Sequence, residues 1–171
     1  MVTELPPFRD LKSCLDTVFG RSRSAVKLSL IYKRKPGTKP LKPRPRPTSW
    51  EEASAEKGMI KRWLYDLQFP YNAVLISIYA RGPERGKAQG GVVKFVMPRL
   101  PMTIRRRRLV YQLVAQCFGK SVRYEQLADE FDIEARLVER YAAAVSECVA
   151  AVTLKAEAIA TDELKERGVI D

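Results

Sequence analysis

Residues 123–140 contain arginines and glutamates whose spacing suits the reading of DNA bases. Arg136 and Arg140 lie four positions apart, so a helix would present both on one face. A guanidinium can donate two hydrogen bonds to a guanine edge, and a glutamate can accept one from a cytosine amino group. The set is mixed in charge, so docking on a protein and plain helical packing are the alternatives to DNA contact. We expect the DNA-reading side chains to be Arg123, Glu134, Arg136, Leu137, Glu139 and Arg140.

A second group of bases is suited to phosphates, which carry no sequence information. An arginine run at 105–108 is expected on the exposed shoulder of a helix. Residues 33–47 contain five prolines, seven bases and no acid, which predicts an extended basic arm, or a solvated tether. The expected contacts to a nucleic-acid backbone or an RNA channel are Arg44, Arg46, Arg85, Lys87, Arg105, Arg106, Arg107 and Arg108.

Most catalytic and metal chemistry is excluded by residue type. No histidine occurs in the 171 residues, so imidazole bases, Ser-His-Asp triads and histidine metal ligands are absent from the chain. Cys14, Cys117 and Cys148 form no CxxC pair and are expected to be buried, reduced thiols. The adjacent acids of residues 129–134 are expected to be solvated. We therefore expect no enzyme activity, no cofactor and no metal.

The glycine-rich segment 81–91 resembles a phosphate cradle only in composition. A P-loop requires Gly-Lys-Ser/Thr, whereas Gly86-Lys87 is followed by Ala88. We expect a mobile basic loop.

Net charge points to a polyanionic partner. The chain carries +11, and residues 1–110 hold 24 of the 31 bases but only 8 of the 20 acids. The acidic remainder suits a protein partner or a solvated face. The absence of a signal peptide or a transmembrane run predicts a cytoplasmic protein without membrane contact.

The reading residues require a helix, a tight turn and a second helix. The pattern predicts helices over 122–131 and from 134 onward, with Ala128, Ile133 and Val138 at the small and apolar positions that a helix-turn-helix needs. Asp132 occupies the turn position that often holds a left-handed glycine.

The remaining pattern is also helical, so we expect a mainly α fold. Helices are predicted over 8–19, after capping boxes at Thr48 and Ser49, over 73–80, and from a cap at Thr103 to Gly119. Residues 25–32 alternate as a short extended piece. The expected organisation is 1–32, a basic arm 33–47, and a helical body 48–171 with the helix-turn-helix at 122–141 and a long C-terminal helix toward residue 159. That alanine-rich helix packs within the fold or against a second copy.

Four aromatic residues lie in the first part of the helical body. They could stack nucleobases, but their spacing favours core packing. They are Trp63, Phe69, Tyr71 and Tyr79.

Over residues 48–160 the chain resembles the Q-type transcription antitermination factors of phages and prophages, including the AlpA-like branch. The resemblance rests on the sigma-factor-like helix-turn-helix at 124–140 and the capped helix and apolar segment at 48–80. It implies a protein that binds a double-stranded DNA element and joins paused bacterial RNA polymerase with its sigma factor. It then narrows the RNA exit path, which would bring nascent RNA close to the basic segments. The alternatives are a conventional helix-turn-helix activator or repressor and a structural RNA-binding protein.

Overall fold

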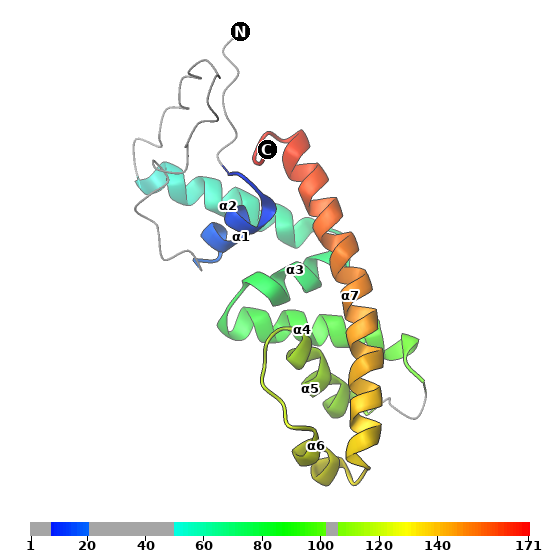
Figure 1. The fold of residues 1–171 in the computed structure, drawn as a ribbon. Helices are drawn as coiled ribbons and strands as arrows, with labels where there is room; N and C mark the ends of the chain where they lie inside the picture. The colour runs from blue at the N-terminus through cyan, green and yellow to red at the C-terminus, as the bar shows by residue number, and fades with distance from the viewer. Residues whose placement is uncertain (1–7, 21–49, 102–105) are drawn as a thin grey trace, which may run out of the picture. The chain divides into compact units, whose positions relative to one another are not determined.

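The computed structural model describes residues 8–20, 50–101 and 106–171, and within them the fold is mainly α (Figure 1). This confirms the fold class expected from the sequence. The β-bridge between Phe8 and Ile170 is isolated and belongs to no strand. The helices are α1 (Leu11–Val18), α2 (Trp50–Asp66), α3 (Tyr71–Tyr79), α4 (Gly82–Val96), the short 3₁₀ helix η1 (Met97–Arg99), α5 (Arg107–Cys117), α6 (Tyr124–Phe131) and α7 (Ala135–Glu166).

The chain divides into two compact units. One unit combines residues 1–65 with 158–171, and the other comprises residues 66–157. The helix α7 contributes residues to both. No helix in the described ranges is both long and apolar enough to cross a membrane.

The first unit joins α1, α2 and the end of α7. Asp10 begins α1 with a capping box, accepting a 2.7 Å hydrogen bond from the Ser13 backbone nitrogen. The indole Nε1 of Trp63 on α2 donates to Glu163 Oε2 on α7 at 2.6 Å. The second of these contacts joins segments that are far apart in the sequence.

The second unit has its core between α3, α4 and α5. A Cβ at Gly91 of α4 would lie 3.2 Å from the Ala73 Cβ of α3, so this glycine permits close packing of the two helices. Burial of this apolar surface stabilises the unit by about 25 cal/mol per Å². The fully buried core side chains include Val74, Leu75, Val92, Val93, Val96, Leu109, Val110, Leu113 and Val114.

The expected loop at 81–91 was wrong, because these residues form the first turns of α4. Arg81 is the extended N-cap residue, Pro83 lies in the first turn, and Glu84 places a carboxylate near the positive end of the helix dipole. Ala88 and Gln89 then face the core. Tertiary packing outweighs the low helix propensity of the glycines.

Other boundaries also differ from the expected ones. The helix expected from Thr103 begins at Arg107, with Arg106 as its N-cap residue. Arg106, Arg107 and Arg108 therefore lie at the positive end of the helix dipole, where cations are unfavourable, so the dipole does not explain the later start. At the other end of the chain, α7 extends to Glu166, beyond residue 159. The expected extended piece 25–32, the basic arm 33–47, the caps at Thr48 and Ser49, and the Thr103 and Arg105 side chains lie outside the described residues.

Candidate nucleic-acid interface

The helices α6 and α7 are joined by a tight turn. Asp132 adopts a left-handed conformation with φ 50° and ψ 58°, as expected for this turn position. The Ile133 backbone nitrogen donates to the Ala128 carbonyl at 3.0 Å, and the Glu134 carbonyl accepts from the backbone of the first turn of α7. Val138 is fully buried, so the apolar inner face of α7 fixes its rotation.

The helix α5 runs antiparallel to α6. At the start of α5, the Arg106 guanidinium donates to the carbonyl of Phe131, the last residue of α6. Near the end of α5, Gln116 Nε2 donates to the Tyr124 hydroxyl at 2.9 Å, at the beginning of α6. Contacts at both ends therefore hold α5 against α6.

Four of the six predicted base-reading residues come together. Glu134, Arg136, Leu137 and Arg140 line one open depression of about 430 Å³. The side chains of Arg136 and Arg140 are exposed, one helical turn apart on α7, whereas Leu137 is partly buried.

The other two predicted base-reading residues lie elsewhere. Glu139 is exposed on α7 outside this depression, and Arg123 is the exposed N-cap residue of α6, at the end away from the turn.

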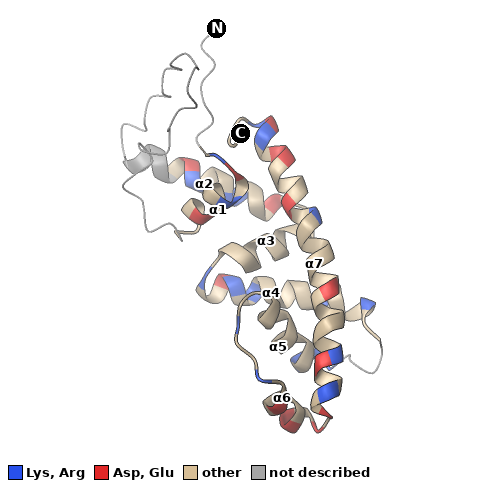
Figure 2. Cartoon of the chain, in the orientation of Figure 1, with Lys and Arg blue, Asp and Glu red and all other residues tan. Residues whose placement is uncertain are grey.

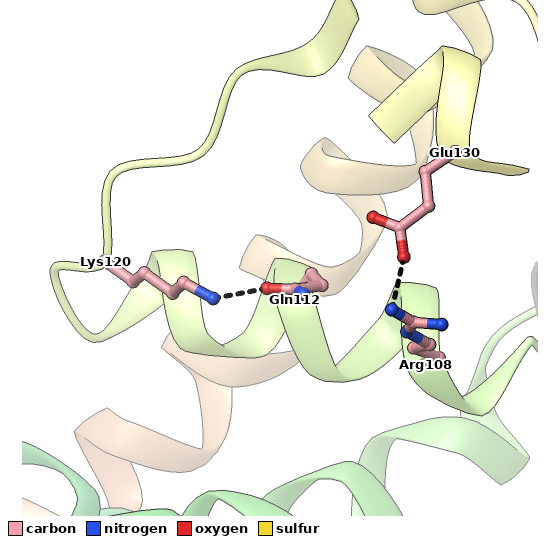
Figure 3. A network of polar contacts seen from close by, with 4 residues as sticks. All are labelled: Arg108, Gln112, Lys120 and Glu130. Carbon is pink, nitrogen blue, oxygen red and sulfur yellow. Dashed lines mark hydrogen bonds and ion pairs between the residues drawn. The ribbon is translucent and has the colours of Figure 1, made fainter. Parts of the chain in front are cut away.

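The described arginines of the 105–108 run are exposed, but they differ in their contacts. Arg106 is held by the Phe131 carbonyl. Arg108 Nη2 lies 2.9 Å from Glu130 Oε1 in an ion pair (Figure 3). Figure 3 also shows Lys120 Nζ donating to Gln112 Oε1 at 2.6 Å on the same side of α5. Arg107 has no hydrogen bond or ion pair to another described residue.

Arg85 and Lys87 take different positions on α4. Lys87 is exposed, whereas Arg85 is partly buried, and its guanidinium donates to the carbonyl of Phe118, the C-cap residue of α5. A cation at this end is favoured by the helix dipole. The Nε atom of Arg85 is buried and has no hydrogen-bond partner among the described residues. Arg85 therefore has a structural contact that its basic neighbours in the sequence did not reveal.

The exposed surface of α6 is acidic (Figure 2). The carboxylates flank a helix whose inner residues, Leu127 and Ala128, are buried. In the usual docking of a helix-turn-helix the first helix crosses the DNA backbone, where carboxylates repel phosphates. The exposed acids of α6 and its turn are Glu125, Asp129, Glu130 and Asp132.

Sequence reasoning missed an aromatic surface formed by the turn before α3, by α4 and by η1. Tyr79 is buried as expected, but the Phe69 side chain is 51% exposed, so core packing was wrong for this residue. Its ring meets the Phe95 ring edge to face, with centroids 6.2 Å apart. The Arg99 guanidinium lies over the Phe95 ring at 3.6 Å. The spacing of Phe95 and Arg99, four residues apart, was the available signal.

No three His, Cys, Asp or Glu side chains among the described residues are grouped to hold a metal ion. Cys117 is exposed and not buried as expected, although partial desolvation of its thiol raises its pKa and lowers its thiolate fraction near neutral pH. Comparison of the chain with protein-family models, curated proteins and solved structures gave no match.

Proposed function

We propose that the chain is a DNA-binding protein acting in transcription, with α6, the turn and α7 as its reading element. The observation that supports this most is the exposure of Arg136 and Arg140 one turn apart on the second helix. In a helix-turn-helix, that helix enters the major groove. The two guanidinium groups read guanine edges, and Glu134 accepts from a cytosine amino group.

The start of α5 supplies phosphate contacts beside this element. Arg106 contacts Phe131, which immediately precedes the turn, so the exposed arginines of this helix end lie close to α6 and α7. Arg107 has no partner among the described residues and is available to a phosphate oxygen. Phosphate contacts here orient the reading helix without adding sequence preference.

The acids of α6 support a second role for the same element, docking on a basic protein surface. Glu125 and Asp129 are exposed on one face, four residues apart. Carboxylates there favour a basic protein patch and disfavour phosphates. We propose as the wider function that the protein loads onto paused RNA polymerase and its sigma factor and suppresses terminators, the role implied by the resemblance to Q-type antitermination factors.

Selection from randomised duplexes tests the DNA-binding proposal directly. We expect enrichment of a site containing guanines, and Arg136→Ala should lose that preference while still binding duplex DNA weakly. Equal binding to all sequences by the unsubstituted protein would contradict the reading role.

Transcription by purified RNA polymerase through an intrinsic terminator tests the wider role. The selected element upstream should be required for increased read-through. The double variant Glu125→Gln/Asp129→Asn should lose read-through while its DNA affinity stays the same or rises, because it removes the proposed protein contact together with two carboxylates that repel phosphates. If the unsubstituted protein binds DNA but does not increase read-through above that of RNA polymerase alone, the protein is a conventional activator or repressor.

A further inference from the structure

Phe69, Phe95 and Arg99 form a continuous surface of two aromatic rings and one guanidinium on the unit of residues 66–157. The Arg99 guanidinium lies flat enough over the Phe95 ring to approach its centroid to 3.6 Å, and its Nη1 donates to the Phe95 carbonyl at 2.6 Å. The Phe69 ring meets Phe95 at an interplanar angle of 76°. Two aromatic rings and one guanidinium therefore form a continuous cluster.

The backbone of α4 and η1 fixes this cluster in place. Gly91, Phe95 and Arg99 follow one another at four-residue intervals, so they lie in one row. A Cβ at Gly91 would lie 3.7 Å from Phe69 Cε2, which shows that the Phe69 ring rests on the row at its glycine. The ring and the guanidinium are thus ordered before any partner arrives, which reduces the entropy lost on binding.

The cluster combines exposure with positive charge. The Phe69 side chain is 51% exposed, and Arg99 and the neighbouring Lys94 are exposed. Residues 85–124 contain ten bases and no acid. Such positive charge does not favour contact with a purely apolar partner, but it attracts a phosphate backbone.

We infer that Phe69, Phe95 and Arg99 form a stacking platform for the unpaired bases of a single-stranded nucleic acid. Bases stack on exposed aromatic rings and on the planes of arginine guanidinium groups. The exposed Lys94, next to Phe95 in the sequence, attracts the backbone between the stacked bases. The platform is independent of the proposed reading of duplex DNA by α7. In a duplex the faces of the paired bases are covered by the neighbouring base pairs, so they cannot stack on the platform.

Binding of short oligonucleotides containing 2-aminopurine tests the platform in the full chain. The fluorescence of this base falls when it stacks, so the measurement separates stacking from charge attraction. Single-stranded RNA, single-stranded DNA of the same sequence and the corresponding duplex are compared at two salt concentrations. The RNA and DNA arms identify which of the two sources of unpaired bases is preferred.

Two conservative variants remove stacking while keeping size or charge. Phe69→Leu should weaken single-strand binding about tenfold and abolish the fluorescence change, because a base gains less on an aliphatic side chain. Arg99→Lys keeps the charge but loses the plane and should show the same loss. Phe69→Tyr retains the ring and should bind like the unsubstituted protein, and Arg62→Lys on α2 is the matched control for Arg99→Lys.

Three outcomes would overturn the inference. The first is equal affinity and equal quenching for the unsubstituted protein, Phe69→Leu and Arg99→Lys. The second is a parallel loss of duplex and single-strand binding in both variants. The third is no single-strand binding combined with Phe69-dependent capture of RNA polymerase, which would make the surface a protein contact. Thermal unfolding midpoints of all variants show whether any loss comes from misfolding.

Discussion

Arg108 and Glu130 form an ion pair of 2.9 Å that connects the first turn of α5 to the last turn of α6. The arginine side chain is 79% exposed and the glutamate 36%. Ion pairs this exposed contribute about 0–1 kcal/mol to stability. The larger consequence of this ion pair is electrostatic, because the pair neutralises one of the arginines beside α6 and α7.

Glu130→Gln should strengthen binding to nucleic acid of any sequence. The change releases Arg108 for a phosphate contact, so the salt dependence of affinity should steepen by about one unit of slope. Glu147→Gln removes one exposed acid from α7 and is the charge-matched control. Titrations at several salt concentrations measure both variants, and an equal gain in the two would mean that only net charge matters.

Sequence alone was sufficient for the helices whose apolar residues repeat at helical intervals. The turn at Asp132 was predictable because the flanking helices leave only three residues between them and aspartate tolerates the left-handed region. The helix over residues 82–91 was not predicted because helix propensity is a local property of the sequence. Gly91 lies in a helix that packs closely against Ala73, a residue of another helix.

The candidate interface was predictable only as a set of residue types. The proximity of Arg136 and Arg140 followed from helical spacing. The contact of Arg85 with Phe118 and the pair of Arg108 with Glu130 depend on how α4, α5 and α6 pack, which periodicity does not specify. Phe69 was assigned to the core because an aromatic residue beside an apolar segment is usually buried, and sequence does not distinguish the last covered position from the first exposed one.

Substitution of the proposed base-reading arginines, Arg136 and Arg140, should affect DNA affinity differently from substitution of the proposed phosphate contact, Arg107. Arg136→Ala and Arg140→Ala should each cost about 1–3 kcal/mol on the cognate duplex and much less on scrambled DNA. Arg107→Ala should weaken both duplexes alike and reduce the salt slope by about one unit. If α7 docks on a protein instead, the first two variants would keep their DNA affinity and lose assembly with RNA polymerase.

The left-handed turn makes a testable demand on position 132. Asp132→Ala should destabilise the fold by about 1 kcal/mol, because a residue with an ordinary Cβ is strained at φ 50°. Asp132→Asn removes the charge but tolerates the conformation, and Asp132→Gly accepts it without strain. Urea unfolding should therefore rank the alanine variant below both others. An equal loss in Asn and Ala variants would assign the effect to the charge.

The buried thiol of Cys14 should make stability fall at alkaline pH. Burial, and secondarily the charge of Asp10, raises the pKa of Cys14 from 9.0 to about 12. The unfolded thiol ionises first as the pH rises, so its contribution is fully present below pH 9 and is lost between pH 9 and 12. Cys14→Ala should show a shallower decline over this range in urea unfolding. In the folded protein, iodoacetamide at pH 8 should modify Cys148, which is partly exposed, well before Cys14.

The hydrogen bond between Trp63 and Glu163 should hold the end of α7 against α2. The donor and acceptor are 100 residues apart in sequence, 2.6 Å apart in space and partly buried, and the acceptor is charged. Glu163→Ala should cost about 1.5–3 kcal/mol in urea unfolding, because the indole N–H loses a charged acceptor. Glu163→Gln keeps an acceptor oxygen and should cost less. Glu166→Ala, at an exposed position three residues further along α7, should stay within about 0.5 kcal/mol of the unsubstituted protein. Tryptophan fluorescence provides the signal, and equal losses for Glu163→Ala and Glu166→Ala would show that this hydrogen bond contributes nothing specific to the first unit.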